Sequence, residues 1–68
     1  MDEIKIKDEF IKLGQAVKLA GLVDTGVEAK FEIQDGNVKV NGVTEVQRGK
    51  KLYKGDNFTY KGKTVKVI

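Results

Sequence analysis

The run Arg48-Gly49-Lys50-Lys51 is the densest basic cluster in this 68-residue chain. An arginine side chain can form two parallel hydrogen bonds to a phosphate, whereas a lysine acts as a mobile point charge. Gly49 has no side chain, so this segment could follow a phosphate backbone closely. The cluster therefore predicts an anion-binding loop, although a solvated surface loop is the plain alternative.

The basic residues are concentrated in the second half of the chain. Residues 1–35 carry five lysines against eight carboxylates, a net charge of −3, and residues 36–68 carry one arginine and seven lysines against two carboxylates, a net charge of +6. Such asymmetry is typical of proteins that bind a polyanion. A lysine-rich surface that serves only solubility is the alternative.

The sequence lacks the residues on which most catalytic and metal sites depend. It contains no cysteine and no histidine, which excludes disulfides, thiolate ligands and the commonest zinc ligand. No acidic run has the spacing of a calcium loop, and no glycine-rich phosphate loop of the G-x-x-x-x-G-K-[ST] type is present. The usual general base and the best nucleophile are missing. We therefore expect a binding protein without catalytic residues, metal or cofactor, not an enzyme.

The length of the chain and the composition of its segments limit the number of domains and the cellular location that we expect. A chain of 68 residues suffices for one domain over residues 1–68, with a small core. The N-terminus is acidic where a signal peptide would be basic, and the apolar runs are far too short for a membrane span. We expect a cytoplasmic protein with no membrane association.

Hydrophobic periodicity divides the first third of the chain into two elements. Residues 3–7 alternate between polar and apolar, as in a half-buried strand. From Phe10 onward, apolar residues recur at intervals of three and four, which predicts a helix that ends near Gly21. Lys12, Gln15 and Lys18 fall on the polar side of that helix.

Residues 27–34 allow two interpretations. Their strict alternation indicates a strand. Thr25 and Glu28, however, have the spacing of a capping box, and Gly36 stands where a helix C-terminus favours a left-handed residue. We favour a helix, a choice supported by the resemblance described below.

The rest of the chain is predicted to form strands, at 38–40, 43–46, 58–60 and 64–67, with Leu52 and Tyr53 as an apolar contact between a polar loop and a turn. Asn41-Gly42 suits a tight turn because both residues tolerate a positive φ, and residues 61–63 would close a terminal hairpin. Tyr53, Phe58 and Tyr60 could in principle stack bases. Phe58 and Tyr53 are instead expected in the core, since a short chain needs its few aromatic residues there. The order strand, helix, helix, strands predicts an α+β fold.

Several short motifs occur in a consistent order. They are Lys12-Leu13, Gly21-Leu22, Thr25, Glu28-Ala29-Lys30, Ile33, Gly36, Val38-Lys39-Val40-Asn41-Gly42 and Gly55-Asp56. In this series the chain resembles the S-four RNA-binding domain, also called the alpha-L motif. A likeness to its small stand-alone bacterial members, the YaaA/YbcJ-like proteins, is seen in Leu13-Gly14-Gln15-Ala16, Lys18-Leu19-Ala20-Gly21 and Arg48-Gly49-Lys50-Lys51-Leu52. Two positions depart from the pattern: many members have an aspartate at the place of Gly14, and many have a basic residue where Gly26-Val27 stands.

The resemblance implies two short helices packed on a small, mostly antiparallel sheet, with an RNA-facing surface formed by the helices and the following hairpin. It implies binding of structured RNA, ribosomal or transfer RNA. We separately expect a monomer, with room for a protein partner in a ribonucleoprotein. Lys30 would lie near the start of the second helix, where free amides also attract phosphate. For Asn41 a turn role competes with RNA contact. Together with the basic cluster, this gives the expected RNA-binding residues Lys12, Gln15, Lys18, Lys30, Lys39, Asn41, Arg48, Lys50 and Lys51.

A protein-interaction module is the competing hypothesis. The first half of the chain has a strong acidic character that could dock a protein partner. The residues concerned are Asp8, Glu9, Asp24, Glu28, Glu32 and Asp35.

Overall fold

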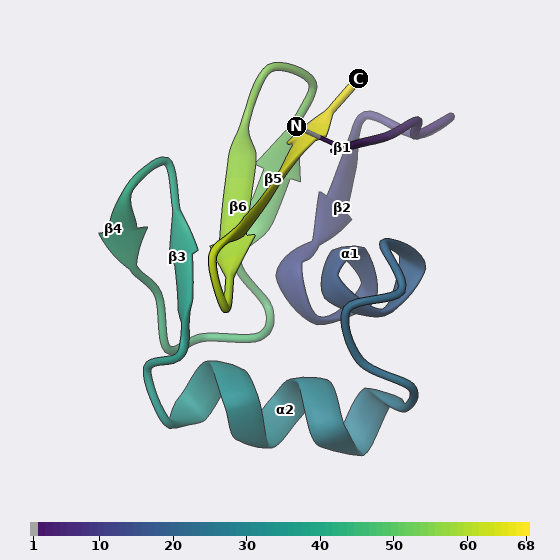
Figure 1. The fold of residues 1–68 in the computed structure, drawn as a ribbon. Coiled ribbons are helices and arrows are strands. Elements are labelled where there is room, and N and C mark those ends of the chain that lie inside the picture. Colours follow the sequence, from purple (N-terminus) through teal and green to yellow (C-terminus); the bar gives the residue numbers. More distant parts are fainter. Residues whose placement is uncertain (1) are drawn as a thin grey trace.

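The computed structural model describes residues 2–68 and shows the α+β arrangement expected from the sequence (Figure 1). Two helices cover one side of a mostly antiparallel sheet. The elements in chain order are β1 Asp2–Ile4, β2 Phe10–Lys12, α1 Leu13–Leu19, α2 Gly26–Gln34, β3 Val38–Val40, β4 Val43–Thr44, β5 Lys51–Tyr53, β6 Asn57–Tyr60 and β7 Lys63–Val67.

The larger sheet has the strand order β1-β7-β6-β3-β4, in which β1 pairs with β7 in parallel and the other neighbours are antiparallel. The parallel pair brings the two ends of the chain together, as Figure 1 shows. The amide of Ile68 donates to the carbonyl of Ile4 at 2.8 Å, and the amide of Ile6 donates to that of Ile68 at 2.9 Å. The predicted strand at 3–7 is thus shorter than expected, but Ile4 and Ile6 are buried as its alternation indicated.

A second sheet contains only β2 and β5, which pair antiparallel with Ile11 opposite Leu52. The prediction that a helix begins near Phe10 is therefore wrong: residues 10–12 form a strand, and α1 begins at Leu13. The apolar spacing between Phe10 and Leu13 resembles a helical repeat by coincidence. Pairing with β5, far along the chain, decides the outcome.

The core lies between the larger sheet and the two helices. Leu13 and Val17 from α1 and Ile33 from α2 are completely buried, as are Phe58 of β6 and Leu52 of β5. Figure 1 shows α2 crossing below the sheet, with α1 seen almost end-on beside it. Both sheets and both helices thus contribute to one hydrophobic cluster. Packing in this cluster fixes the position of α1 relative to β5.

Local hydrogen bonds explain why residues 26–34 form a helix despite their alternating pattern. The hydroxyl of Thr25 accepts from the amide of Glu28 at 3.0 Å, and the Glu28 carboxylate accepts from the amide of Asp24 at 2.9 Å. Gly36 has a φ of 81°, and its amide donates to Ile33 at the helix C-terminus. The predicted Thr25 cap and Gly36 stop are confirmed, whereas Glu28 accepts from the amide one residue before the one that a capping box uses.

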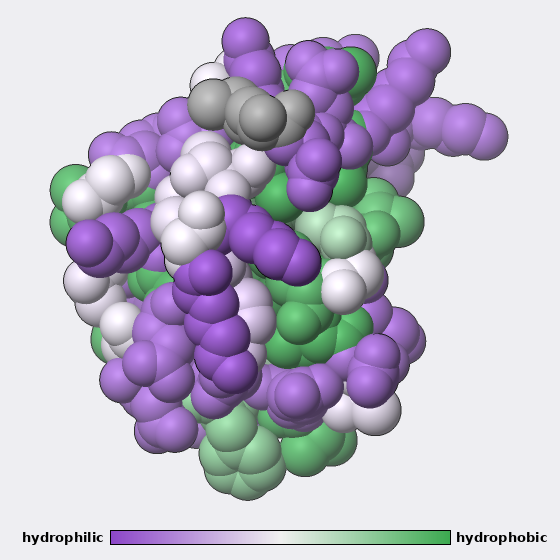
Figure 2. Space-filling view, in the orientation of Figure 1, coloured by the Kyte–Doolittle hydropathy of each residue, from purple (hydrophilic) through white to green (hydrophobic). Residues whose placement is uncertain are grey.

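The Asn41-Gly42 turn joins β3 to β4 with φ angles of 50° and 84°, as the sequence predicted. The return strand is shorter than the predicted 43–46 and covers Val43–Thr44. Apolar side chains also remain outside the core. Val27 and Phe31 of α2 are more than half exposed, and Figure 2 shows apolar atoms at the lower edge of the molecule, over α2.

Candidate nucleic-acid interface

The basic loop after β4 is docked on the N-terminus of α1 by its backbone. The amide of Leu13 donates to the carbonyl of Lys50 at 2.8 Å, and the amide of Gly14 donates to that of Arg48 at 2.9 Å. Lys12, at the N-cap position, makes no side-chain capping bond. Loop carbonyls therefore satisfy amides that a helix N-terminus leaves free, and the Arg48 side chain is held beside α1.

This docking creates a groove with a volume of about 370 Å³ between α1, the loop and the start of α2. Four predicted RNA-binding residues from two distant segments meet there: Lys12, Gln15 and Lys18 with Arg48. All four are exposed. The groove is completed by three glycines, Gly14, Gly26 and Gly49.

No carboxylate belongs to the described residues that line this groove. Gly14 is one of these lining residues, and it has space for a side chain. A Cβ atom placed on it would lie 3.5 Å from the Arg48 Cβ, an ordinary contact distance. The first side-chain atom of another residue is therefore tolerated here, and an aspartate at this position would add a negative charge near Arg48. With glycine, the charged lining side chains are all cationic.

Lys50 and Lys51 extend the positive surface from the groove. Lys50 is exposed, and its carbonyl caps α1. Lys51 lies directly opposite Lys12 in the β2–β5 pair. Like charges at directly opposed positions destabilise a strand pair, so this arrangement weakens the free protein slightly while placing Lys51 beside the groove residue Lys12.

The other three predicted contacts lie outside the groove. Lys30 is the fifth of nine residues in α2, so it lies beyond the first turn, and its ammonium is 6.0 Å from the centre of the Phe31 ring. The expectation that Lys30 lies at the helix start is therefore wrong. Lys39 is exposed between buried Val38 and Val40, on the sheet face opposite the helices.

Asn41 is occupied by structural hydrogen bonds. Its side-chain amide donates to the Asp56 carboxylate at 3.1 Å, and its side-chain oxygen accepts from the amide of Asn57 at 3.0 Å. The turn role considered for Asn41 is therefore present in the structure. RNA contact by Asn41, Lys30 and Lys39 stays a prediction.

The expectation that Tyr53 belongs to the core is wrong, whereas that for Phe58 is confirmed. Tyr53 is 44% exposed and Phe58 is fully buried. In β5 the middle residue, Leu52, faces the core, so its neighbours Lys51 and Tyr53 must face outward. The aromatic pair Tyr53 and Phe10 was thus missed by sequence reasoning. The alternation of side chains in Phe10-Ile11-Lys12 could have indicated a strand with Phe10 on its outward face.

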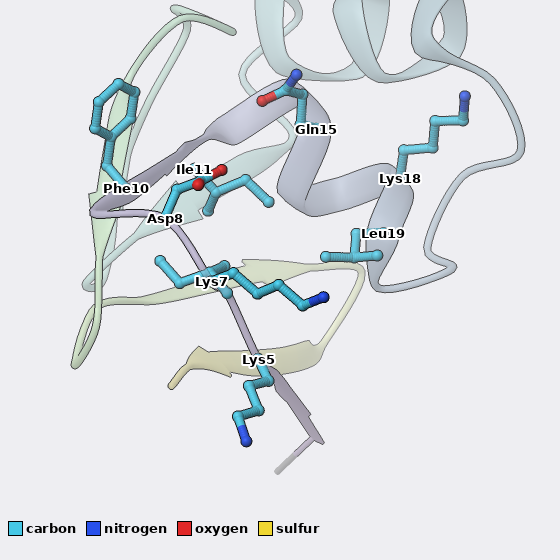
Figure 3. Close-up of a pocket in the computed structure, with 9 residues that line it drawn as sticks. Lys5, Lys7, Asp8, Phe10, Ile11, Gln15, Lys18 and Leu19 are labelled. Carbon is cyan, nitrogen blue, oxygen red and sulfur yellow. The ribbon is translucent and has the colours of Figure 1, made fainter.

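A shallow apolar hollow of about 730 Å³ adjoins the groove and shares Gln15 and Lys18 with it. Figure 3 shows Ile11 and Leu19 beside the stem of Lys7, with Phe10 directed away from them. Leu19 is 58% exposed.

Glu32 of α2 and Tyr60 of β6 form a separate polar contact away from the groove. The Tyr60 hydroxyl donates to the Glu32 carboxylate, which lowers the pKa of Glu32 and raises that of Tyr60. The Tyr60 hydroxyl also raises the pKa of Lys61 through a hydrogen bond. These shifts belong to a contact between a helix and the sheet, and its position suits a structural role.

Over residues 2–68, no helix is long and apolar enough to cross a membrane. Across the same range, no group of three or more acidic side chains is placed so that it could hold a metal ion.

Comparison with known proteins agrees with this fold. The family profile described as the S4 domain matches residues 4–68. The chain belongs to the S4 domain family. It is 41% identical over 59 residues to the probable ribosome maturation protein RlbA of Bacillus subtilis (strain 168), covering 87% of this chain and 83% of the relative. It is 32% identical over 62 residues to the candidate RNA-binding protein YbcJ of Escherichia coli (strain K12), covering 91% and 89% respectively. The resemblance drawn from the motif series is thereby confirmed for this S4 domain protein.

Proposed function

We propose that this S4 domain protein binds structured RNA without catalysis, and that the groove of Lys12, Lys18 and Arg48 holds the RNA phosphates. The observation that carries the proposal is the convergence of these cations, with Gln15, in one groove without a carboxylate among its described lining residues. Cations of this kind neutralise phosphates and release condensed counterions. Gln15 can donate a hydrogen bond to a phosphate or a 2′-hydroxyl.

The relatives support an RNA partner and suggest its class. One relative carries a name that assigns it to RNA binding, and another carries a name that assigns it to ribosome maturation. We therefore favour ribosomal RNA over transfer RNA, with the protein acting as a cytoplasmic monomer on a ribosomal particle. Duplex RNA offers phosphates and 2′-hydroxyls rather than a readable major groove, so recognition would rely on shape.

The test compares two variants with the same net charge. Lys12→Gln with Arg48→Gln removes two groove cations, and Lys63→Gln with Lys66→Gln removes two exposed cations of β7 that lie outside the groove. Binding of a labelled ribosomal RNA hairpin is measured by fluorescence anisotropy between about 50 and 200 mM salt. Removing one cation that neutralises a phosphate reduces the slope of log affinity against log salt by about 1, so we expect a reduction of about 2 in the groove variant alone.

Two results would contradict this proposal. Equal losses in both variants would mean that net charge, and not the groove, attracts RNA. Absence of binding by the unmodified protein at the lowest salt would remove RNA as the partner.

A protein-docking role remains the second candidate function, and one observation favours it. Helix α2 exposes Val27 and Phe31 beside the acidic residues Glu28 and Asp35. A partner with apolar and basic side chains would suit this face. Capture of a partner that survives ribonuclease treatment and is lost in Val27→Ser with Phe31→Ser would support it, whereas release of all bound material by ribonuclease would exclude it.

A further inference from the structure

The outward face of the β2–β5 pair carries two aromatic and two basic side chains. Phe10 lies opposite Tyr53, and Lys12 lies opposite Lys51. The other face of the pair carries Ile11, which packs against the core, and buried Leu52. The alternation of a strand therefore sends all four outward residues to the same surface, directly beside the groove that Lys12 also lines.

Tyr53 is presented to solvent on a rigid support. Its ring is 44% exposed, whereas Phe10 is half-buried and packs against it with ring centres 6.1 Å apart and planes inclined by 54°. The amide of Tyr53 donates to the Asp56 carboxylate at 2.7 Å, and its carbonyl accepts from the amide of Asp56 at 2.9 Å. These bonds fix the backbone on which the exposed ring stands.

The scarcity of aromatic residues makes this exposure informative. The chain has three phenylalanines and two tyrosines, of which Phe58 and Tyr60 are buried in the core. A small domain gains stability by burying such side chains. Tyr53 forgoes a large part of that gain, although a lysine or threonine would suit the outward face of β5 equally well.

The charges around the aromatic pair indicate what would cover it. The Lys51 ammonium lies 4.7 Å from the centre of the Phe10 ring, and Lys12 continues into the groove. An apolar peptide would have to cover both ammonium groups. A nucleotide instead supplies a flat π-face for the ring and a phosphate for the lysines.

We propose that Tyr53, supported by Phe10, stacks an unpaired base of the RNA whose neighbouring phosphates lie in the groove. This inference rests on the function proposed above and extends it: the ligand is a junction between paired and unpaired RNA, not a plain duplex. Stacking tolerates any base, so the platform selects an unpaired nucleotide without selecting its sequence.

Three RNAs that share one labelled stem test the proposal. The first has a flush end, the second a short uridine tail, and the third the same tail with abasic nucleotides, which keep the phosphates but lack bases. Removing one base–aromatic stack reduces affinity by roughly 5- to 150-fold. We expect the protein to bind the uridine tail tighter than the abasic tail by that factor. In Tyr53→Ala the preference should vanish, with flush-stem binding unchanged, whereas Tyr53→Phe should retain it.

Each result separates the two proposals. Equal affinity of the unmodified protein for the uridine and abasic tails, with the flush stem still bound, overturns the platform and leaves groove binding in place. A base preference that persists in Tyr53→Ala also overturns it and directs the base to the apolar hollow at Leu19 instead. Failure to bind any of the three RNAs overturns both proposals. The circular dichroism spectrum of Tyr53→Ala checks that the variant is folded.

Discussion

Replacing Asp56 by alanine should destabilise the protein by about 2 kcal/mol, because this one carboxylate joins two separate turns. One oxygen accepts from the amide of Tyr53 at 2.7 Å, and the other accepts from the side chain of Asn41 at 3.1 Å. A hydrogen bond to a charged group contributes about 1.5–3 kcal/mol. We reduce this to about 1 kcal/mol for each bond, because both donors belong to exposed residues and solvent competes there.

A loss of this size is large for so small a domain. At roughly 0.05–0.15 kcal/mol per residue, total stability is only about 3–10 kcal/mol. A change of 1 kcal/mol shifts Tm by about 4–8 °C in domains of this length, so Asp56→Ala should lower Tm by about 8–16 °C. Asp56→Asn is the matched control: its remaining oxygen can accept one of the two bonds, and we expect an intermediate loss.

A double-mutant cycle isolates the bond between the turns. Asn41→Ala alone also removes the bond from the Asn57 amide and places alanine at a φ of 50°, so its cost exceeds that of the shared bond. Combining Asn41→Ala with Asp56→Ala cancels those extra terms and should give a coupling of about 1 kcal/mol in urea unfolding. A coupling within error of zero would refute the conclusion that the Asn-Gly and Gly-Asp motifs act as a structural pair.

Three further predictions concern stability and pH. Thr25→Ala should cost about 1 kcal/mol in urea unfolding by removing the cap on the Glu28 amide; a neutral result would mean that solvent caps α2 equally well. Tyr60→Phe should raise the pKa of Glu32 toward 4.5, as followed by NMR titration. Because the folded-state pKa of Glu32 is lowered, this bond stabilises the fold above about pH 4.5, and its contribution is lost as pH falls through the folded-state pKa. The unfolding free energies of the unmodified protein and the variant should therefore converge in acid. A difference in unfolding free energy that stays constant with pH would contradict this. Lys12→Gln should raise stability at low salt by a few tenths of a kcal/mol, since it relieves the repulsion from Lys51, while it weakens RNA binding; a loss of stability would show that the lysine stem matters more than its charge.

The parts of the fold that follow from local interactions were predictable from the sequence. Thr25, Glu28 and Gly36 mark both ends of α2 by bonds within a few residues, and this local chemistry overrode a strand-like alternation. The Asn41-Gly42 turn is local in the same sense. Such elements can be predicted from the local sequence, because their hydrogen-bonding partners are neighbours in the chain.

Strand β2 could not be recognised in this way. Its three residues gain their structure from Lys51–Tyr53, far along the chain, and an apolar spacing of three between Phe10 and Leu13 is also helical. The assignment of Tyr53 to the core was a separate error, made because the chain has few aromatic residues. In β5, Leu52 takes the buried position, so Tyr53 faces outward.

The candidate groove was partly predictable for the same reason. Lys12, Gln15 and Lys18 are close in sequence, and their shared side could be read from the periodicity of the first helix. Arg48 joins these residues because two backbone hydrogen bonds connect the loop to the start of α1. Backbone hydrogen bonds of this kind cannot be predicted from the pattern of side chains. Lys39 could have been separated from this set, because its alternation with Val38 and Val40 already places it on the outward sheet face.

The groove and the aromatic pair would contribute to RNA affinity in physically different ways. Phosphate contacts through Lys12 and Arg48 weaken as salt rises, because they depend on counterion release. Stacking on Tyr53 buries a ring against a base and releases no ions from that contact. In a salt series, the affinities for the uridine and abasic tails should therefore fall in parallel, with a constant ratio between them. A ratio that shrinks toward one at high salt would mean that the base preference has an electrostatic origin, at Lys51 and not at the Tyr53 ring.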